Sequence, residues 1–148
     1  MDSAAIRTAT AADAGEIARL SAQLGYPAET GVFAQRLTRL LASARHAVFV
    51  AVDARDRRRL HGLITAEHRL TLGLGEGVEI IGLVVDAAAR RGGVGRALVD
   101  AAEGWARRAG SAEVFLRSNV IRPEAHPFYE GIGYLRTKTQ HVYLKRLS

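Results

Sequence analysis

The sequence predicts a mixed α/β (α+β) fold in which helices flank a central, mostly antiparallel sheet. The strongest indication is an apolar run rich in β-branched residues over 78–85, which is typical of a buried strand. A glycine-rich turn follows, and apolar residues then recur at the spacing of an amphipathic helix over 94–109. Apolar segments at 47–52 and 60–67, separated by a charged turn, predict an antiparallel hairpin before the central strand.

The remaining segments fit the same fold. Thr10 and Asp13 have the spacing of a capping box in which Asp replaces Glu, and Gly110 is a plausible residue for ending the central helix. The other expected elements, in chain order, are a strand at 6–8, helices at 14–24 and about 30–43, a strand at 112–117, a short helix at 123–130 and a final strand at 140–144. The helix over 94–109 is expected to connect two parallel strands.

Composition restricts the class of protein. The 148 residues are most simply one domain, and 48% hydrophobic with 24% charged residues is ordinary for a soluble globular protein. The longest apolar run is well short of the ~18 residues of a membrane span, and the N-terminus lacks a signal-peptide pattern, so we expect a cytoplasmic location and no membrane partner. The absence of cysteine excludes disulfides and thiolate metal sites, and the five histidines show no ligand spacing, so no metal is predicted.

The turn after the central strand has the features of a phosphate-binding site. A helix N-terminus presents unpaired N–H groups and the positive end of the helix dipole. Three glycines let an anion approach the backbone, and three arginines add positive charge. These residues are Arg90, Arg91, Gly92, Gly93, Gly95 and Arg96. The P-loop string does not occur, and the dinucleotide fingerprint G-x-G-x-x-G fails at its third glycine.

The string R-x-x-G-x-G over 90–95 resembles the loop with which the GNAT superfamily of N-acetyltransferases holds the pyrophosphate of acetyl-coenzyme A (acetyl-CoA). A second segment, A-H-x-F-Y-E-x-x-G-Y over 125–134, is similar to a motif near the C-terminus of many family members. Together the motifs resemble small, single-domain members of the aminoglycoside-6′ type. The resemblance implies one GNAT domain over 1–148 with acetyl-CoA as cofactor. It also implies acetyl transfer by direct attack, in which a primary amine of a small molecule, peptide or protein attacks the thioester of acetyl-CoA.

The resemblance also implies site residues. Family members splay the central strand from its neighbour, so that backbone groups near Leu83, Val84 and Val85 bind the pantetheine. Tyr129 is the expected general acid, which donates a proton to the leaving thiolate. The other expected cofactor-binding residues of the turn are Arg90, Arg91, Gly92, Gly93, Val94, Gly95 and Arg96. Many relatives have an asparagine where this chain has Arg122, so Asn119 is the candidate for that pantetheine contact instead. His126 is a candidate cofactor contact, with core packing as the alternative.

The sequence does not decide which residue accepts the proton of the amine. Many family members carry a glutamate at the position of Ile81, and this sequence lacks it. Glu79 lies two residues earlier, so strand alternation puts its side chain on the same face as Ile81 and Leu83, provided that the bulge expected at Gly82 starts beyond Glu79. Glu79 is therefore the candidate base. The alternatives are that Glu79 binds a cationic substrate or is a structural carboxylate paired with an arginine.

Two other classes of function stay open on the sequence alone. One is a catalytically idle acyl-CoA-binding module, which would release no thiol with any amine. The other is a nucleic-acid-binding domain that uses the net charge of +6, although the arginines at 57–59 lack interleaved aromatic residues. The same positive charge disfavours a polycationic aminoglycoside as substrate.

We also expect a homodimer, because a C-terminal strand leaves a sheet edge to be paired and relatives often pair or exchange such strands.

Overall fold

A computed structural model describes residues 5–90, 92–118 and 125–148. The chain divides into two compact units, Met1–Arg117 and Ser118–Ser148. The first unit contains the whole sheet and three of the α-helices, and the second contains a short helix and the C-terminal segment. Across the described residues, no helix combines the length and apolar character needed to cross a bilayer.

The first unit has the predicted order of strands and helices. Its elements are β1 (Ala5–Thr8), the 3-10 helix η1 (Ala11–Asp13), α1 (Ala14–Gln23), α2 (Thr30–Leu41), β2 (His46–Val52), β3 (Leu60–Thr71), β4 (Gly75–Val85), the 3-10 helix η2 (Ala87–Ala89), α3 (Val94–Arg108) and β5 (Val114–Leu116). The sheet order is β1-β2-β3-β4-β5, and all neighbours are antiparallel except β4 and β5, which are parallel. The mixed, mostly antiparallel sheet with flanking helices is therefore confirmed.

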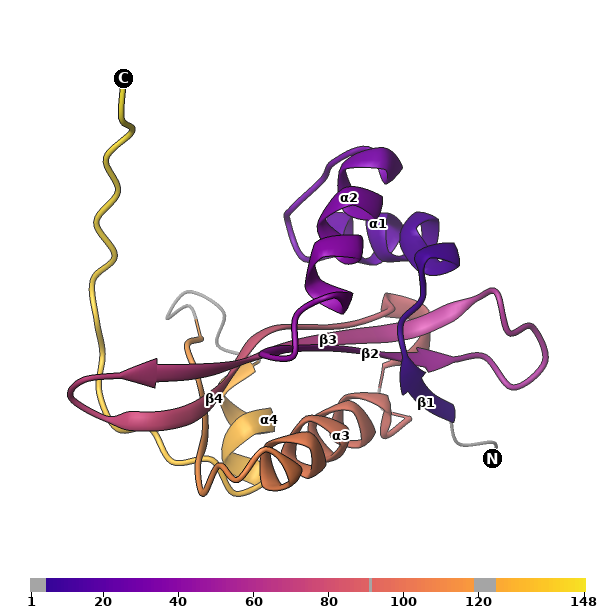
Figure 1. The fold of residues 1–148 in the computed structure, drawn as a ribbon. Coiled ribbons are helices and arrows are strands. Elements are labelled where there is room, and N and C mark those ends of the chain that lie inside the picture. The colour runs from indigo at the N-terminus through magenta and orange to yellow at the C-terminus, as the bar shows by residue number, and fades with distance from the viewer. Residues whose placement is uncertain (1–4, 91, 119–124) are drawn as a thin grey trace. The chain divides into compact units, whose positions relative to one another are not determined.

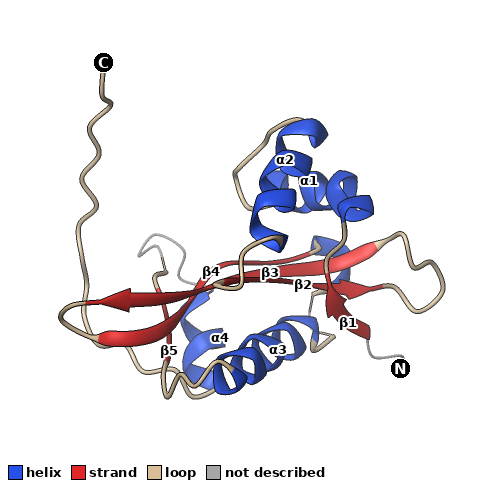
Figure 2. Cartoon of the chain, viewed as in Figure 1, coloured by secondary structure: helices blue, strands red, loops and turns tan. Residues whose placement is uncertain are grey.

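Helices cover both faces of this sheet (Figures 1 and 2). One face packs against α1 and α2 through an apolar core that includes Ile17, Leu20 and Leu63. On the other face α3 crosses β3 so closely that a Cβ atom at Gly62 would lie 2.8 Å from Leu98 Cδ1. The same Cβ atom would lie 3.0 Å from the Val84 carbonyl oxygen, so a side chain here would force Leu98 to shift and crowd the backbone of β4. The close packing of α3 on β3 therefore favours glycine at this position.

One irregularity in β4 changes which side chains share a face. The flanking pairs on β3 and β4 are Ala66 with Ile80 and Thr65 with Gly82. Ile81 is thus an extra residue without a partner, which is a β-bulge. Since directly paired residues share a face, Glu79 lies on the α1–α2 side with Val84, whereas Leu83 lies on the α3 side. A bulge is present as expected, but at Ile81 and not at Gly82. Because alternation does not hold across an inserted residue, Glu79 does not share a face with Leu83 as expected.

The second unit contains α4 (Ala125–Gly131) and an extended C-terminal segment. The strand expected at 140–144 is wrong, since residues 134–148 form neither helix nor strand. A strand needs a neighbour to complete its hydrogen-bond ladder, and the described residues of this unit include no other strand. The side chains of Val142, Tyr143 and Leu144 are consequently 77–91% exposed.

Candidate functional site

The glycine–arginine turn lies between β4 and α3, where the sequence predicts it. Gly93 is the N-cap of α3 with φ of 82°, a left-handed conformation that glycine adopts without the cost a side chain adds. Gly92 and Gly93 are exposed, while Val94 and Gly95, the first two residues of α3, are buried. No acidic residue lies in the first turn of this 15-residue helix. The backbone at its N-terminus is therefore open to an anion.

The arginines of the turn differ in position and in their contacts. Arg90 follows η2 in an extended conformation and is exposed. Arg96 lies on the exposed side of α3, with its Nε atom 3.7 Å from Asp100 Oδ1. Arg91 lies outside the described residues. The positive charges that can be placed therefore flank the helix N-terminus and leave its glycine backbone accessible.

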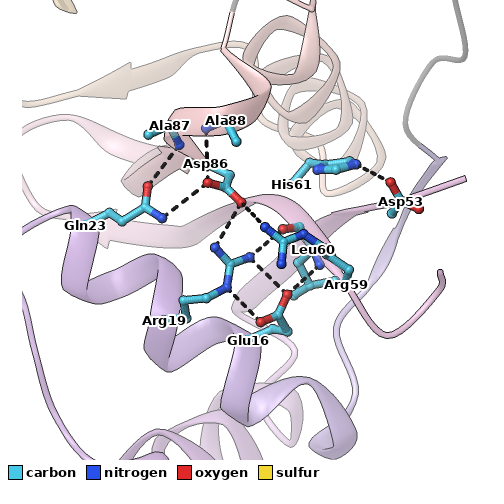
Figure 3. Close-up of polar contacts among 10 residues, drawn as sticks. All are labelled: Glu16, Arg19, Gln23, Asp53, Arg59, Leu60, His61, Asp86, Ala87 and Ala88. Atoms are coloured by element: carbon cyan, nitrogen blue, oxygen red, sulfur yellow. Dashed lines mark hydrogen bonds and ion pairs between the residues drawn. The ribbon is translucent and has the colours of Figure 1, made fainter. Parts of the chain in front are cut away.

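A buried carboxylate positions the start of this turn (Figure 3). Asp86 directly follows β4 and is 3% exposed. Its Oδ1 atom accepts the N–H of Ala88 at 3.2 Å and the side-chain amide of Gln23 at 3.3 Å. Its Oδ2 atom accepts from Arg19 at 2.9 Å and from Arg59 at 3.4 Å. Burial alone would raise the pKa of Asp86, but the Ala88, Arg19 and Gln23 donors outweigh it and lower the pKa below the usual aspartate value.

The same network extends into α1 and β3. Arg19 donates to Glu16 at 2.8 Å and to the Leu60 carbonyl at 2.9 Å, and Glu16 accepts the Leu60 N–H at 2.9 Å. Gln23 accepts the N–H of Ala87 at 3.0 Å, which fixes η2 as well. Sequence reasoning missed this cluster. Its one local signal is an aspartate at the N-cap position directly after a buried strand.

The central strand separates from its parallel neighbour after Ile80. Among the described residues, β4 pairs with β5 at Val78–Ile80, opposite Val114–Leu116, and not beyond. The stretch Leu83, Val84 and Val85 pairs with β3 on one side and has no β5 partner within the described part of the chain. Its other edge therefore presents backbone hydrogen-bonding groups along the path from the bulge at Ile81 to the glycine–arginine turn.

Glu79 is a buried carboxylate with two arginine partners. It is 4% exposed. Its Oε2 atom accepts from Arg117 at 2.8 Å, and its Oε1 atom is paired with Arg69. Arg69 also bonds Glu67 at 2.8 Å, so the carboxylates and arginines form a chain across β3, β4 and the end of β5. This arrangement matches the structural alternative considered for Glu79.

The second unit carries the other predicted site residues. The Tyr129 ring lies edge-on to Phe128 at a centroid distance of 5.1 Å and to Tyr134 at 6.1 Å. Burial raises the pKa of the Tyr129 phenol, so it keeps its proton at neutral pH. His126 lies one turn earlier on α4 and is half-buried. Asn119 lies outside the described residues. The turn and strand residues thus lie together in the first unit, and Tyr129 and His126 lie together in the second.

Comparison with known proteins agrees with this architecture. The Acetyltransferase (GNAT) family matches residues 16–134. An aminoglycoside N(6′)-acetyltransferase type 1 from Stenotrophomonas maltophilia is 32% identical over 140 residues, which cover 90% of this chain and 87% of that protein. The uncharacterized N-acetyltransferase YhdJ of Bacillus subtilis is 34% identical over 93 residues, 63% of this chain and 66% of YhdJ.

Solved structures share the fold. Aminoglycoside N-acetyltransferase AAC(6′)-Iy in complex with CoA superposes with a TM-score of 0.85 at 20% identity, over 99% of this chain and 98% of that one. AAC(6′)-Ih from Acinetobacter baumannii gives a TM-score of 0.83 at 18% identity, over 97% and 99% of the two chains. The chain therefore belongs to the GNAT acetyltransferase family: it is an N-acetyltransferase, and its cofactor is acetyl-CoA.

Proposed function

We propose that the protein transfers an acetyl group from acetyl-CoA directly to the primary amine of a small molecule. The observation that carries this proposal is the unpaired edge of Leu83–Val85 leading into the open N-terminus of α3 at Gly93. The backbone of that strand stretch would hold the pantetheine. The backbone N–H groups and arginines over 90–96 would hold the pyrophosphate, because both offer positive potential to an anion. Contacts from Asn119 and His126 to the cofactor stay predictions.

The reaction requires that the protein position the amine against the thioester and supply one proton donor for the leaving sulfur. When bound, acetyl-CoA supplies the acetyl group as a thioester. The amine nitrogen bonds to the acetyl carbon as the carbon–sulfur bond breaks, with one proton lost from nitrogen and one gained by sulfur. Tyr129 is the proposed donor to sulfur, since its phenol is protonated at neutral pH. A thiol pKa of about 8.5 makes the thiolate an acceptable leaving group.

The similarity to the S. maltophilia aminoglycoside enzyme favours a small-molecule amine over a protein substrate. The reaction is expected in the cytoplasm, where acetyl-CoA is available, and residues 1–148 are expected to act as one domain. Both expectations stay predictions.

Thiol release at constant acetyl-CoA, measured over a panel of amines, tests the proposed function. Release should exceed the amine-free rate with at least one amine, and mass spectrometry should find one acetyl group on the product per thiol released. Tight acetyl-CoA binding without amine-dependent release would identify an idle binding module. Steeply salt-dependent DNA binding without acetyl-CoA binding would identify a nucleic-acid-binding domain.

The Asp86 network should matter for cofactor binding as well as stability, because it fixes the backbone that enters the turn. Asp86→Asn should weaken acetyl-CoA binding roughly tenfold, equivalent to about 1.4 kcal/mol, measured by titration calorimetry. Asp13→Asn is the matched control: Asp13 is equally buried and bonds Arg7 at 2.7 and 2.9 Å, away from the turn. Each variant should lose about 1–3 kcal/mol of unfolding free energy. Equal acetyl-CoA affinities for the two variants would contradict the positioning role.

The same two variants give a test by pH. The pKa values of Asp86 and Asp13 are both lowered in the folded protein. Their stabilisation is therefore present above the unfolded aspartate pKa of about 3.9 and is lost as the pH falls through the lower folded values. Denaturant unfolding should show a smaller loss of stability on acidification below pH ~4 in each variant than in the wild type.

For Glu79 we propose the structural role, because both of its oxygens are paired with arginines. Glu79→Gln should lower the unfolding free energy by roughly 1–3 kcal/mol, since it removes the charge that two arginines share. The turnover number should stay within about twofold of the wild type at a temperature where the variant is folded. A fall of 10²-fold or more in turnover would instead make Glu79 the base, and an increase in KM for the amine alone would make it the substrate anchor.

We also propose a homodimer in which the C-terminal segment of one copy pairs with a sheet edge of another. The exposed apolar side chains of Val142, Tyr143 and Leu144 support this, because such a run is covered in most soluble proteins. Light scattering should give twice the chain mass at micromolar concentration, and a variant truncated after residue 134 should give the single chain mass. A full-length monomer mass that is independent of concentration would rule the dimer out.

A further inference from the structure

The sheet face beneath α1 and α2 changes character along its length. At one end it is the apolar core around Leu63 and Val84. At the other end it carries His46, Glu67 and Ile81. Ile81 is 55% exposed, because it is the bulged residue of β4 and lies just beyond the residues that pair with β5. A single exposed apolar side chain needs no explanation by itself, but this one borders a pocket.

A pocket of about 180 Å³ opens over this end of the face. It lies between the C-terminal part of α2 and strands β2, β3 and β4, and its lining is mostly aliphatic. The lining residues are Leu40, His46, Ala47, Val48, Thr65, Ala66, Glu67 and Ile81. An apolar cavity of about 150 Å³ is known to hold benzene. The pocket therefore has room for one group of about that size.

Glu67 supplies the charge at this pocket. Its side chain is 29% exposed, and its two oxygens are held at 2.9 Å by His46 Nε2 and at 2.8 Å by Arg69 Nε. His46 is held in turn by Ser43 Oγ at 2.9 Å from Nδ1. Arg69 does not line the pocket. The carboxylate is thus fixed in orientation by neighbours on two sides and retains lone pairs for a further donor.

The pocket adjoins the proposed cofactor path. Ile81 lies two residues before Leu83, about 7 Å along an extended strand. A group bound over Ile81 would have its end within reach of the acetyl group on a pantetheine held along Leu83–Val85. Glu79 does not compete for it, since that carboxylate is buried and paired with Arg69 and Arg117.

We infer that this pocket is the acceptor site and that it takes a primary amine carrying one apolar group of about the size of a benzene ring, with the ammonium bound by Glu67. The inference rests on the proposed function for its chemistry, but the pocket binds the amine with or without turnover. A polyhydroxylated, polycationic sugar fits neither the aliphatic lining nor the single carboxylate. The favoured acceptor therefore differs from that named for the S. maltophilia relative.

The test uses the full chain and phenethylamine as the probe, with ethanolamine and kanamycin as comparisons. Calorimetry in the presence of CoA should show one phenethylamine site, and thiol release should give kcat/KM at least tenfold higher for phenethylamine than for either comparison. Ile81→Trp fills the pocket and should abolish phenethylamine binding. Glu67→Gln should raise its KM roughly tenfold or more. Acetyl-CoA affinity should be unchanged in both variants.

Glu76→Gln is the matched control, because Glu76 lies on the same hairpin, pairs with Arg45 and His68, and does not line the pocket. It should behave as the wild type. Phenethylamine binding that survives both Ile81→Trp and Glu67→Gln would overturn the inference, as would acetylation of kanamycin in preference to phenethylamine. In either case amine-dependent thiol release would leave the proposed function standing. Failure of the proposed function is a separate result: phenethylamine binds at the pocket, but no amine releases thiol.

Discussion

Gly93→Glu should abolish the rise in Tm that acetyl-CoA produces in the wild-type protein. A ligand at 100 times its Kd stabilises the native state by about 2.7 kcal/mol, which for a chain of this size is a rise of roughly 5–11 °C. Gly93 is the N-cap of α3, and its Cα faces open space. A glutamate there would place a side chain and a negative charge where the pyrophosphate is expected. Thermal unfolding with and without acetyl-CoA measures the effect.

Gly110→Glu is the control that separates this effect from backbone strain. Gly110 follows the other end of α3 with φ of 83°, and it too faces open space. Both substitutions therefore carry a similar left-handed backbone cost of about 1–2 kcal/mol. Gly110→Glu should lower the Tm of the free protein but keep the full acetyl-CoA shift. A folded Gly93→Glu protein with the full shift would show that the turn does not bind the cofactor.

Tyr129→Phe should lower the turnover number by roughly 10- to 10⁴-fold, the range typical of a lost general acid. The variant keeps the ring that packs against Phe128 and Tyr134, so its Tm should be little changed. Because burial raises the pKa of the phenol, the wild-type turnover number should not decline through loss of this proton until the pH exceeds about 10. Steady-state thiol release across pH measures both effects.

Tyr134→Phe is the comparison for this experiment, since it removes a hydroxyl from the neighbouring ring of the same aromatic cluster. Its turnover number should stay within about twofold of the wild type. If the two variants have the same turnover number as the wild type while acetyl transfer is rate-limiting, Tyr129 serves packing and bulk water protonates the thiolate.

The local spacing of residues along the chain was sufficient to predict most of the strands, turns and helices of the first unit. The apolar run over 78–85, the glycines at the start of the next helix and the alternation in the hairpin are short-range patterns, and each corresponds to one strand, turn or helix in the structure. The glycine–arginine turn was predictable for the same reason, because its phosphate-binding features lie within seven consecutive residues, 90–96.

The C-terminal strand shows where local pattern is insufficient. Residues 140–144 have strand-like composition, but a strand exists only when another strand pairs with it, and composition does not supply that partner. The face of Glu79 is a similar case. Its alternation with Leu83 depends on an unbroken register, and that register shifts at Ile81, which has no partner on β3.

The polar clusters were decided by the tertiary structure alone. Asp86 meets Arg19 across 67 residues of sequence, and Glu79 meets Arg117 across 38. Nothing in the spacing of these residues predicts their contact, because it arises only when the helices and strands pack and a buried carboxylate must find donors. The sequence by itself determined the elements of the first unit, their order and the position of the glycine–arginine turn. Packing decided that Glu79 is buried between Arg69 and Arg117, whereas Glu67, which pairs with Arg69 and His46, lines the pocket.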